Sequence, residues 1–246
     1  MERIRSLGRM LVVVTLLLAA PAHARHRQAA AEAGDFDYYL LSLSLAPSFC
    51  ALSPANRAKD ECQALTEADF RQTPLTVHGL WPNRARVSVN RQPQNCAGPP
   101  LDDLSAAVQD QLKRYMPGGP GLAQYEWRKH GACSGLSPEA YFATVVRLAQ
   151  HANETIGVAM REQAMLGQPV RIADLLAAVT DRDPALASAI VVKCRFPRGG
   201  GQALIDEIRV VLSKDLTPMP AGRVGLGQNA GCPQGAGFVP DGPPGQ

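Results

Sequence analysis

Six cysteines behind a hydrophobic leader are the feature that most constrains how this 246-residue chain can fold. Residues 1–24 combine three arginines, an apolar stretch from Met10 to Ala20 and the small-residue ending Ala22-His23-Ala24, which is typical of a secretory signal peptide cleaved after Ala24. An even number of cysteines in an exported chain favours disulfides over free thiols, although spacing alone does not select their pairing. The cysteines all follow the leader and are Cys50, Cys62, Cys96, Cys133, Cys194 and Cys232.

The remainder of the chain has the length of one domain. We expect residues 25–246 to form a single domain with a substantial core, ending in a Gly- and Pro-rich tail from about residue 218 that only Cys232 holds. No other apolar run reaches the ~18 residues that a membrane helix requires, so the exported protein is expected in a periplasm or outside the cell. The formal charge of +3 falls to about +1 without the leader, and bulk charge therefore does not argue for nucleic acid.

Hydrophobic periodicity predicts an α+β fold with a mostly antiparallel central sheet packed against helices. Residues 37–45 alternate apolar and polar positions, as in a strand with one buried face, and residues 75–80 form a second strand that Pro82 and Asn83 would end. Further strands are expected at residues 190–194 and 205–212, separated by a turn at 198–201. Helices are expected at residues 101–116, around 125–133, from Ser137 as N-cap, at 171–179 and at 183–189.

Two short motifs carry most of the chemical information. They are Leu75-Thr-Val-His-Gly-Leu-Trp-Pro82 and Tyr125-Glu-Trp-Arg-Lys-His-Gly-Ala-Cys133. The chain has five histidines, of which His23 and His26 lie in or beside the leader. His78, His130 and His151 remain as candidates for proton transfer near neutral pH, and two of these lie in the motifs.

Each motif alone also has a purely structural interpretation. On a helix, Glu126, Lys129, His130 and Cys133 would project from one face, and Glu126 would simply form ion pairs worth ~0.3 to 0.5 kcal/mol each. His78 would then be a core histidine beside Trp81. The presence of both motifs in one chain, in this order and upstream of further cysteines, favours a shared active site.

Together the motifs resemble the two active-site segments of the ribonuclease T2 family, which are secreted and periplasmic endoribonucleases. The resemblance extends from Tyr38-Tyr-Leu-Leu-Ser-Leu through Pro47-Ser-Phe-Cys50 to Ile190-Val-Val-Lys-Cys194, and so covers most of the chain beyond the leader. It implies a disulfide-linked, ribonuclease T2-like fold in which Cys50 pairs with Cys62, Cys96 with Cys133, and Cys194 with Cys232.

The resemblance also implies a metal-free cleavage of single-stranded RNA, with no cofactor and no action on DNA. His130 would be the base that activates the 2'-hydroxyl and His78 the acid that protonates the leaving 5'-oxygen. Lys129 would neutralise the phosphorane, and Glu126 would assist there or hold its neighbours. A 2',3'-cyclic phosphate would form and then open to a 3'-phosphate.

Three residues are candidates for substrate binding. Trp81 is suited to stack on a base, Asn83 follows the first motif, and Tyr125 can donate one hydrogen bond to phosphate. Many members have histidine where this chain has Tyr125, so phosphate binding is expected to be weaker here. Many also have tryptophan in place of Leu45, a packing change that leaves the catalytic set intact.

Other interpretations of the same residues are less favoured. A metal enzyme using Glu126, His130 and His78 as ligands would place Lys129 beside a dication, and no His-Glu-x-x-His string is present. A catalytically impaired RNA-binding or defence protein on the same scaffold would be expected to lack a catalytic histidine. We expect the protein to be a monomer.

Two surface features stay ambiguous in the sequence. Arg84, Arg86 and Arg91 either line a phosphate path or belong to a solvated loop. Asn153-Glu-Thr155 has the form of an N-glycosylation site, but its expected position on a helix favours a chance match.

Overall fold

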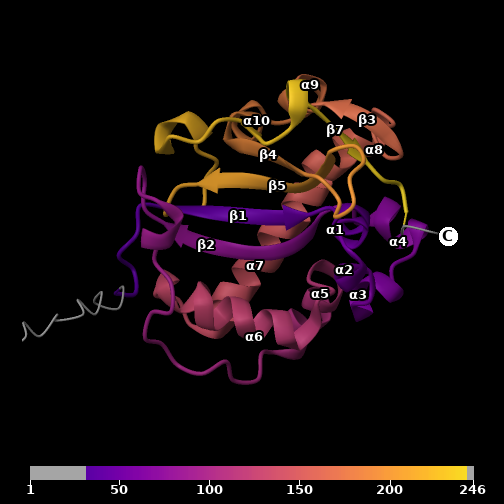
Figure 1. The fold of residues 1–246 in the computed structure, drawn as a ribbon. Coiled ribbons are helices and arrows are strands. Elements are labelled where there is room, and N and C mark those ends of the chain that lie inside the picture. The colour runs from indigo at the N-terminus through magenta and orange to yellow at the C-terminus, as the bar shows by residue number, and fades with distance from the viewer. Residues whose placement is uncertain (1–31, 243–246) are drawn as a thin grey trace, which may run out of the picture.

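A central sheet organises the computed structural model, which describes residues 32–242. The signal peptide expected at residues 1–24 lies outside the described residues. Neighbouring strands run in the order β2-β1-β5-β4-β6, with β7 joined to β5 and β3 to β7 (Figure 1). The strands are β1 (Tyr38–Ser44), β2 (Thr76–Asn83), β3 (Gln168–Arg171), β4 (Ile190–Arg195), β5 (Leu204–Leu212), β6 (Asn229–Ala230) and β7 (Ala236–Val239). Pairing is antiparallel except for β4 with β6 and β5 with β7, which confirms the predicted α+β class.

Helices cover the sheet and its ends (Figure 1). The long helix α7 crosses behind the sheet, α5 and α6 lie below it, and α9 and α10 lie above it in this view. The helices are α1 (Ala46–Ala51), α2 (Pro54–Arg57), α3 (Asp60–Gln63), α4 (Glu67–Gln72), α5 (Ala106–Tyr115), α6 (Gly119–Lys129), α7 (Pro138–Ala152), α8 (Val158–Glu162), α9 (Ile172–Thr180) and α10 (Pro184–Ala189). Ser137 and Asp183 cap α7 and α10 as predicted, because each side chain accepts a backbone N–H of the first turn.

Strand β1 is buried on both faces, and the prediction of one buried face was therefore wrong. Tyr39, Leu41 and Leu43 point into the main core, whereas Tyr38 and Leu40 belong to a second cluster on the opposite face. That second cluster is completed by residues of β4, β5 and the chain beyond residue 218: Val191, Val211, Ala221 and Val224. The C-terminal segment, which was expected to be a loosely held tail, thus covers this second face of β1.

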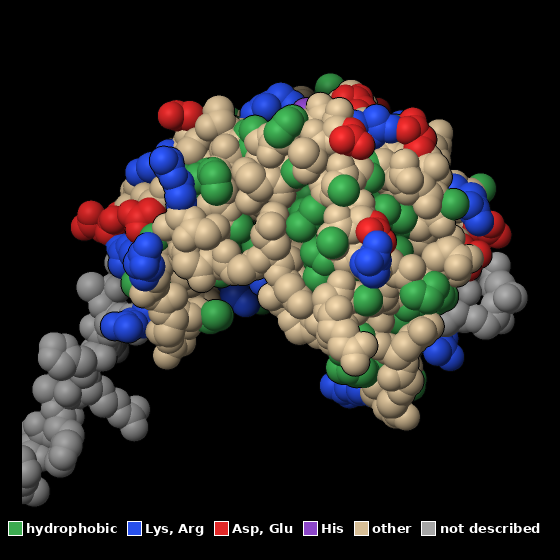
Figure 2. Space-filling model, turned by 90° about the horizontal axis from the view of Figure 1, so that it is seen from above, with side chains coloured by type: hydrophobic (Ala, Val, Ile, Leu, Met, Phe, Trp, Pro, Cys, Tyr) green, Lys and Arg blue, Asp and Glu red, His purple; other side chains and the backbone are tan. Residues whose placement is uncertain are grey.

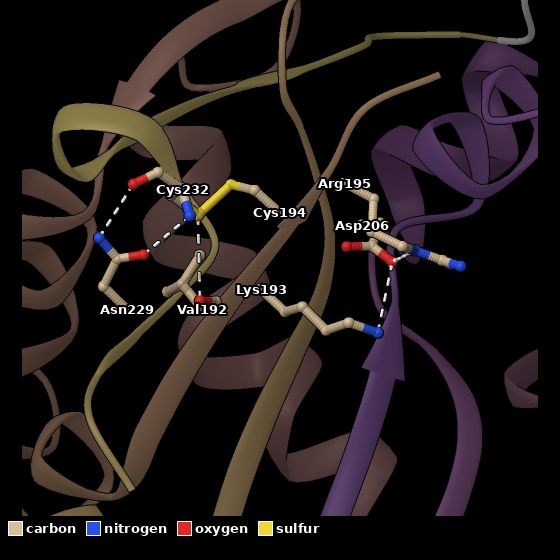
Figure 3. Close-up of a disulfide and its surroundings, with 7 residues drawn as sticks. All are labelled: Val192, Lys193, Cys194, Arg195, Asp206, Asn229 and Cys232. Carbon is tan, nitrogen blue, oxygen red and sulfur yellow. Dashed lines mark hydrogen bonds and ion pairs between the residues drawn. A yellow bond between two sulfur atoms is a disulfide. The ribbon is translucent and has the colours of Figure 1, made fainter. Parts of the chain in front are cut away.

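Consequently the segment after residue 218 is not a tail held only by Cys232. It contains a 3₁₀ helix at Ala221–Val224 as well as β6 and β7, both of which pair with the sheet. The Cys194–Cys232 disulfide ties it to β4, and Asn229 exchanges hydrogen bonds of 2.9 and 3.0 Å with the Cys232 backbone (Figure 3). Glycine and proline here mark the turns between short paired elements.

Strand β2 continues through Pro82 and Asn83, which were expected to end it. Pro82 is opposite Tyr39 and Asn83 opposite Tyr38 in the antiparallel ladder with β1. Proline is tolerated because β2 is at the edge of the sheet, where one row of backbone groups needs no partner. His78 therefore lies within β2 and not near its end.

Helix α5 begins five residues later than the apolar spacing from Leu101 suggested, and α6 ends before the second motif does. Ser105 caps α5 by accepting the Val108 N–H at 3.4 Å, and residues 101–104 before it have no regular secondary structure. Helix α6 stops at Lys129, because His130 leaves the helical conformation (φ −127°) and Cys133 lies on a separate 3₁₀ turn. The prediction that Cys133 shares one α-helical face with Glu126 was therefore wrong.

Two buried polar side chains fix β2 onto the helical layer. Asn153 accepts the Leu75 N–H at 3.1 Å and donates to the Leu75 carbonyl at 2.8 Å, from the π-helical turn Asn153–Gly157 after α7. Tyr141 of α7 donates to the Leu80 carbonyl at 2.8 Å. These anchors lie on either side of His78. The Asn153 amide is buried and fully engaged, so it is not placed to accept a glycan.

Charges on the surface are mixed. Figure 2 shows Lys and Arg side chains interspersed with Asp and Glu around the visible face, without a field of one sign. Within residues 32–242, no helix is both long and apolar enough to cross a membrane.

The three disulfides have the pairing that the family resemblance implies: Cys50–Cys62, Cys96–Cys133 and Cys194–Cys232. The last two enclose nearly equal lengths of chain, with sequence separations of 37 and 38 residues. The cost of removing each should therefore be similar, about 2 to 5 kcal/mol in unfolding free energy.

We predict that the double variants Cys96→Ala/Cys133→Ala and Cys194→Ala/Cys232→Ala lose similar stability but unequal activity. Only the first frees the turn that follows His130, so it should lose far more activity at a temperature where both remain folded. Thermal unfolding, and assays of the RNA cleavage that the resemblance implies, measure this on the two variants. Equal activity losses at matched stability would contradict the argument.

Candidate active site

The two motifs meet in a cleft of about 800 Å³ on the outer face of β1, β2 and β5. Antiparallel partners share a sheet face, and the register places Tyr38 and Leu40 of β1, Trp81 and Asn83 of β2, and Arg209 of β5 on this one. The end of α6 forms one wall and residues 224–230 form another. All seven candidate site residues line the cleft: His78, Trp81, Asn83, Tyr125, Glu126, Lys129 and His130.

Glu126 connects the motifs through a buried carboxylate. Its side chain is 1% exposed and its Oε2 accepts the Trp81 indole N–H at 2.8 Å. Burial raises the pKa of Glu126, against the lowering effects of the Trp81 hydrogen bond and of His78 and Lys129 nearby. Its Oε1 lies 3.9 Å from His78 Nε2.

Gly79 makes this contact possible. A Cβ at this position would lie 2.9 Å from the Glu126 carboxyl carbon, and closer still to Glu126 Oε2 and Trp81 Nε1. Any side chain at residue 79 would therefore occupy the space in which the hydrogen bond forms. The glycine of the first motif is required for close approach, and not merely for a turn.

His78 faces a carboxylate on each side. Nδ1 lies 3.0 Å from Glu207 Oε1 on β5, and Nε2 is directed toward Glu126. The Trp81 ring meets the imidazole edge-on at 5.2 Å between centroids. The His78 side chain is 40% exposed, so it remains accessible from the cleft.

Glu207 was not anticipated from the sequence. Its side chain is 4% exposed and contacts Lys193 Nζ at 3.2 Å and Arg209 Nη2 at 2.6 Å, besides His78. Burial raises the pKa of Glu207, but the His78 hydrogen bond and the charges of Arg209 and Lys193 outweigh it and lower the pKa well below its usual range. The available signal was the string Asp206-Glu-Ile-Arg209 inside an otherwise apolar strand, since buried charges need partners.

His130 has the opposite electrostatic surroundings. It follows the last residue of α6 with its ring tilted over Trp81 at 5.3 Å between centroids. Burial, together with the charges of Lys129 and His78, lowers its pKa to about 4. Its Nδ1 is buried and has no hydrogen-bond partner among residues 32–242.

Lys129 and Tyr125 form a pair at the mouth of the cleft. Lys129 Nζ donates to the Tyr125 hydroxyl at 2.5 Å and lies 5.0 Å from the centre of its ring. Tyr125 is exposed, whereas Asn83 is buried and uses its amide to donate to the Trp81 carbonyl at 3.0 Å. Tyr125 and Asn83, two of the three candidates for substrate binding, thus border the cleft, but Asn83 presents little surface to it.

The loop between β2 and α5 holds the end of α6 in place. The Asn95 N–H donates to the Lys129 carbonyl at 2.9 Å, immediately before the Cys96–Cys133 disulfide. Trp127 is buried on the opposite side of α6 and donates from Nε1 to the Pro99 carbonyl at 2.9 Å. The tryptophan of the second motif is therefore structural.

The arginines and the third histidine that the sequence singled out differ in whether they line the cleft. Arg84 and Arg86 line the cleft, whereas Arg91 is not among its lining residues. His151 lies outside the cleft on α7, with Nε2 3.8 Å from Asp183. Within residues 32–242, no group of three or more His, Cys, Asp or Glu side chains is arranged to hold a metal ion.

Comparison with known proteins places this geometry in context. The sequence model of the ribonuclease T2 family matches residues 36–220. Ribonuclease I of Escherichia coli (strain K12) is 36% identical over 173 residues, which are 59% of this chain and 64% of that protein. A ribonuclease of Aeromonas hydrophila is 36% identical over 140 residues, or 57% of each chain. The chain thus matches less than two thirds of the length of these relatives.

Solved structures share the fold at low sequence identity. Ribonuclease MC1 from the seeds of bitter gourd superposes with a TM-score of 0.60 at 21% identity, covering 83% of this chain and all of that one. RNase NT in complex with 5'-AMP superposes with a TM-score of 0.58 at 17% identity, covering 84% and 98% of the two chains.

We predict that Gly79→Ala separates Trp81 from Glu126 and strongly lowers both stability and activity. Gly121→Ala is the matched control, because its Cβ would meet nothing within 4 Å on α6 and should raise helix stability by ~0.5 to 1 kcal/mol. Thermal unfolding and RNA cleavage rates test both variants. Full activity in Gly79→Ala would show that the contact is dispensable.

Proposed function

The chain belongs to the ribonuclease T2 family, and we propose that it is an endoribonuclease that cleaves single-stranded RNA by metal-independent transphosphorylation. The observation that carries this proposal is the pair of histidines in one cleft with opposite surroundings. His78 lies between the carboxyl groups of Glu126 and Glu207, whereas burial and the charge of Lys129 lower the pKa of His130. One proton acceptor and one proton donor are thus available together.

In this mechanism His130 removes the proton of the 2'-hydroxyl. The 2'-oxygen bonds to the adjacent phosphorus as the bond from phosphorus to the 5'-oxygen breaks, and His78 Nε2–H protonates the departing oxygen. The product is a 2',3'-cyclic phosphate. Water then opens it to a 3'-phosphate with the roles of the two histidines reversed. DNA lacks the 2'-hydroxyl and should not be cleaved.

Lys129 and Glu126 support the transition state in this proposal. Lys129 borders the cleft beside His130 and supplies positive charge where the phosphorane oxygens become negative. Glu126 holds the Trp81 indole and lies within 4 Å of His78 Nε2, so it keeps the two motifs in register. The role of Lys129 is inferred from its charge and its place beside His130, and that of Glu126 from its contacts with Trp81 and His78.

Trp81, Tyr125 and Asn83 are the proposed substrate-binding residues. Tyr125 offers an exposed hydroxyl next to Lys129, and Trp81 offers the edge of a ring that already contacts His130 and Arg209. Crystal structures of proteins with the same fold have been solved in complex with 5'-UMP and 5'-AMP, which supports nucleotides as ligands. Because Asn83 is buried, we propose that it acts by fixing the Trp81 backbone.

We also propose that residues 25–246 form one exported, monomeric catalytic domain. The main core joins residues from Phe36 to Val239 and so supports one folded unit across the described chain. The alternative of a catalytically impaired RNA-binding protein is not favoured, because His78, Glu126, Lys129 and His130 all border the same cleft.

Replacing His78 or His130 by Ala should lower kcat by at least ~100-fold while RNA binding survives, because general acid or base catalysis acts in the transition state. His151→Ala is the control. It removes a histidine side chain outside the cleft and should leave kcat nearly unchanged. Kinetics on a dinucleotide test the three variants, and comparable damage from His151→Ala would refute the assignment.

The pH dependence of kcat/KM should be bell-shaped, with an ascending limb near pH 4. The base must be neutral, and the pKa of His130 is lowered from 6.5 to about 4, so its active form is already dominant at mildly acidic pH. Activity falls again where His78 loses its proton. An ascending limb near pH 6.5, or a rate that rises steadily into alkaline pH, would be inconsistent with this assignment.

A further inference from the structure

We propose that Glu207 is a positioning residue for the acid, holding the His78 imidazole so that Nε2 is the atom that exchanges its proton in the cleft. This rests on the proposed function, in which His78 is the acid. Glu207 does not itself border the cleft, and so acts through His78 without touching substrate.

A β-bulge aims His78 at Glu207. In the ladder with β1, Val77 is opposite Leu43 and Gly79 is opposite Ser42, so His78 is an extra residue with no partner. Bulges re-aim a side chain locally and are common beside active sites. Strand β1 lies between β2 and β5. Its residues opposite Arg209 and Glu207 are the small side chains Ser42 and Ser44, which leave space for the imidazole to reach across β1 to Glu207.

The hydrogen bond has only one possible direction. An ionised carboxylate accepts and cannot donate, so the 3.0 Å contact requires a proton on His78 Nδ1. In the neutral ring Nε2 is then the free acceptor, and in the charged ring Nε2–H is the donor that faces Glu126 and the cleft. Glu207 thereby selects the tautomer in which proton transfer occurs at the accessible nitrogen.

Glu207 is held ionised and immobile by two cations on the same sheet. Lys193 is its cross-strand partner on β4 and lies 3.2 Å from Oε2, while Arg209, two residues along β5, lies 2.6 Å from the same oxygen. Oε1 is left for His78. The titratable groups that face the imidazole are therefore Glu207 and Glu126, with Lys193 and Arg209 behind Glu207.

The neighbouring Asp206 provides a matched control. It is a second buried carboxylate on β5, which pairs with Arg195 (Figure 3) and has Oδ2 3.9 Å from Lys193 Nζ. The ion pairs of His78 within residues 32–242 are with Glu126 and Glu207, and not with Asp206. Removing its charge disturbs the same buried network without touching the imidazole. An effect specific to Glu207 thus separates positioning from general loss of stability.

The test compares Glu207→Gln and Asp206→Asn on two substrates. On a dinucleotide, whose 5'-oxygen needs protonation to leave, Glu207→Gln should lower kcat about 10- to 100-fold with little change in KM. On a nucleoside 3'-(4-nitrophenyl) phosphate, whose leaving group needs no acid, the loss should shrink to ~3-fold or less. Asp206→Asn should affect both substrates equally. Equal losses on both substrates for Glu207→Gln would overturn the proposal.

A measurement on the unaltered protein decides the matter if Glu207→Gln does not fold. Nitrogen-15 NMR of the histidine rings should show neutral His78 protonated at Nδ1. His151, whose neighbouring carboxylate Asp183 faces Nε2 at 3.8 Å, serves as the reference. Protonation of neutral His78 at Nε2 would contradict the proposal. Cleavage of the dinucleotide by the unaltered protein tests the proposed function separately.

Discussion

Burial of the Glu126 carboxylate is the constraint on which the rest of the site depends. A buried carboxylate is costly unless it is hydrogen-bonded, and here the indole of Trp81 supplies the bond. That bond requires a glycine at residue 79 and requires the C-terminal turn of α6 to bring Glu126 against β2. Asn153 and Tyr141 anchor β2 to the helical layer, and the Cys96–Cys133 disulfide anchors the chain after α6. Both histidines are then positioned as consequences of the same contact.

The two histidines differ because their environments differ, although the residue type is the same. His78 is on a strand between carboxylates from β5 and α6, while His130 is at the end of a helix beside Lys129 and against Trp81. Carboxyl groups flank the first imidazole, whereas burial and the charge of Lys129 lower the pKa of the second to about 4. Acid and base catalysis in one step requires two such groups whose surroundings give them different proton affinities.

The sequence predicted those features whose interacting groups are close together along the chain. Ser137 and Asp183 were correctly identified as caps because a side chain and the N–H that it accepts are three residues apart. The catalytic candidates clustered as expected because both motifs have specific spacing. Predictions failed where distant chain segments decide: the second buried face of β1 comes from residues beyond 218, and Pro82 stays in β2 only because that strand is at the sheet edge. Glu207 was missed because its partner His78 is 129 residues away.

The central claim is that this cleft cleaves RNA at its own 2'-hydroxyl by two histidines without a metal. Phosphorus-31 NMR of a dinucleotide incubated with the purified protein in EDTA tests it most directly. The account predicts a 2',3'-cyclic phosphate that accumulates first and is then converted to a 3'-phosphate, and no reaction when the 2'-hydroxyl is replaced by hydrogen. A 5'-phosphate product, cleavage of the deoxy substrate, or activity that EDTA abolishes and a divalent metal restores would contradict it.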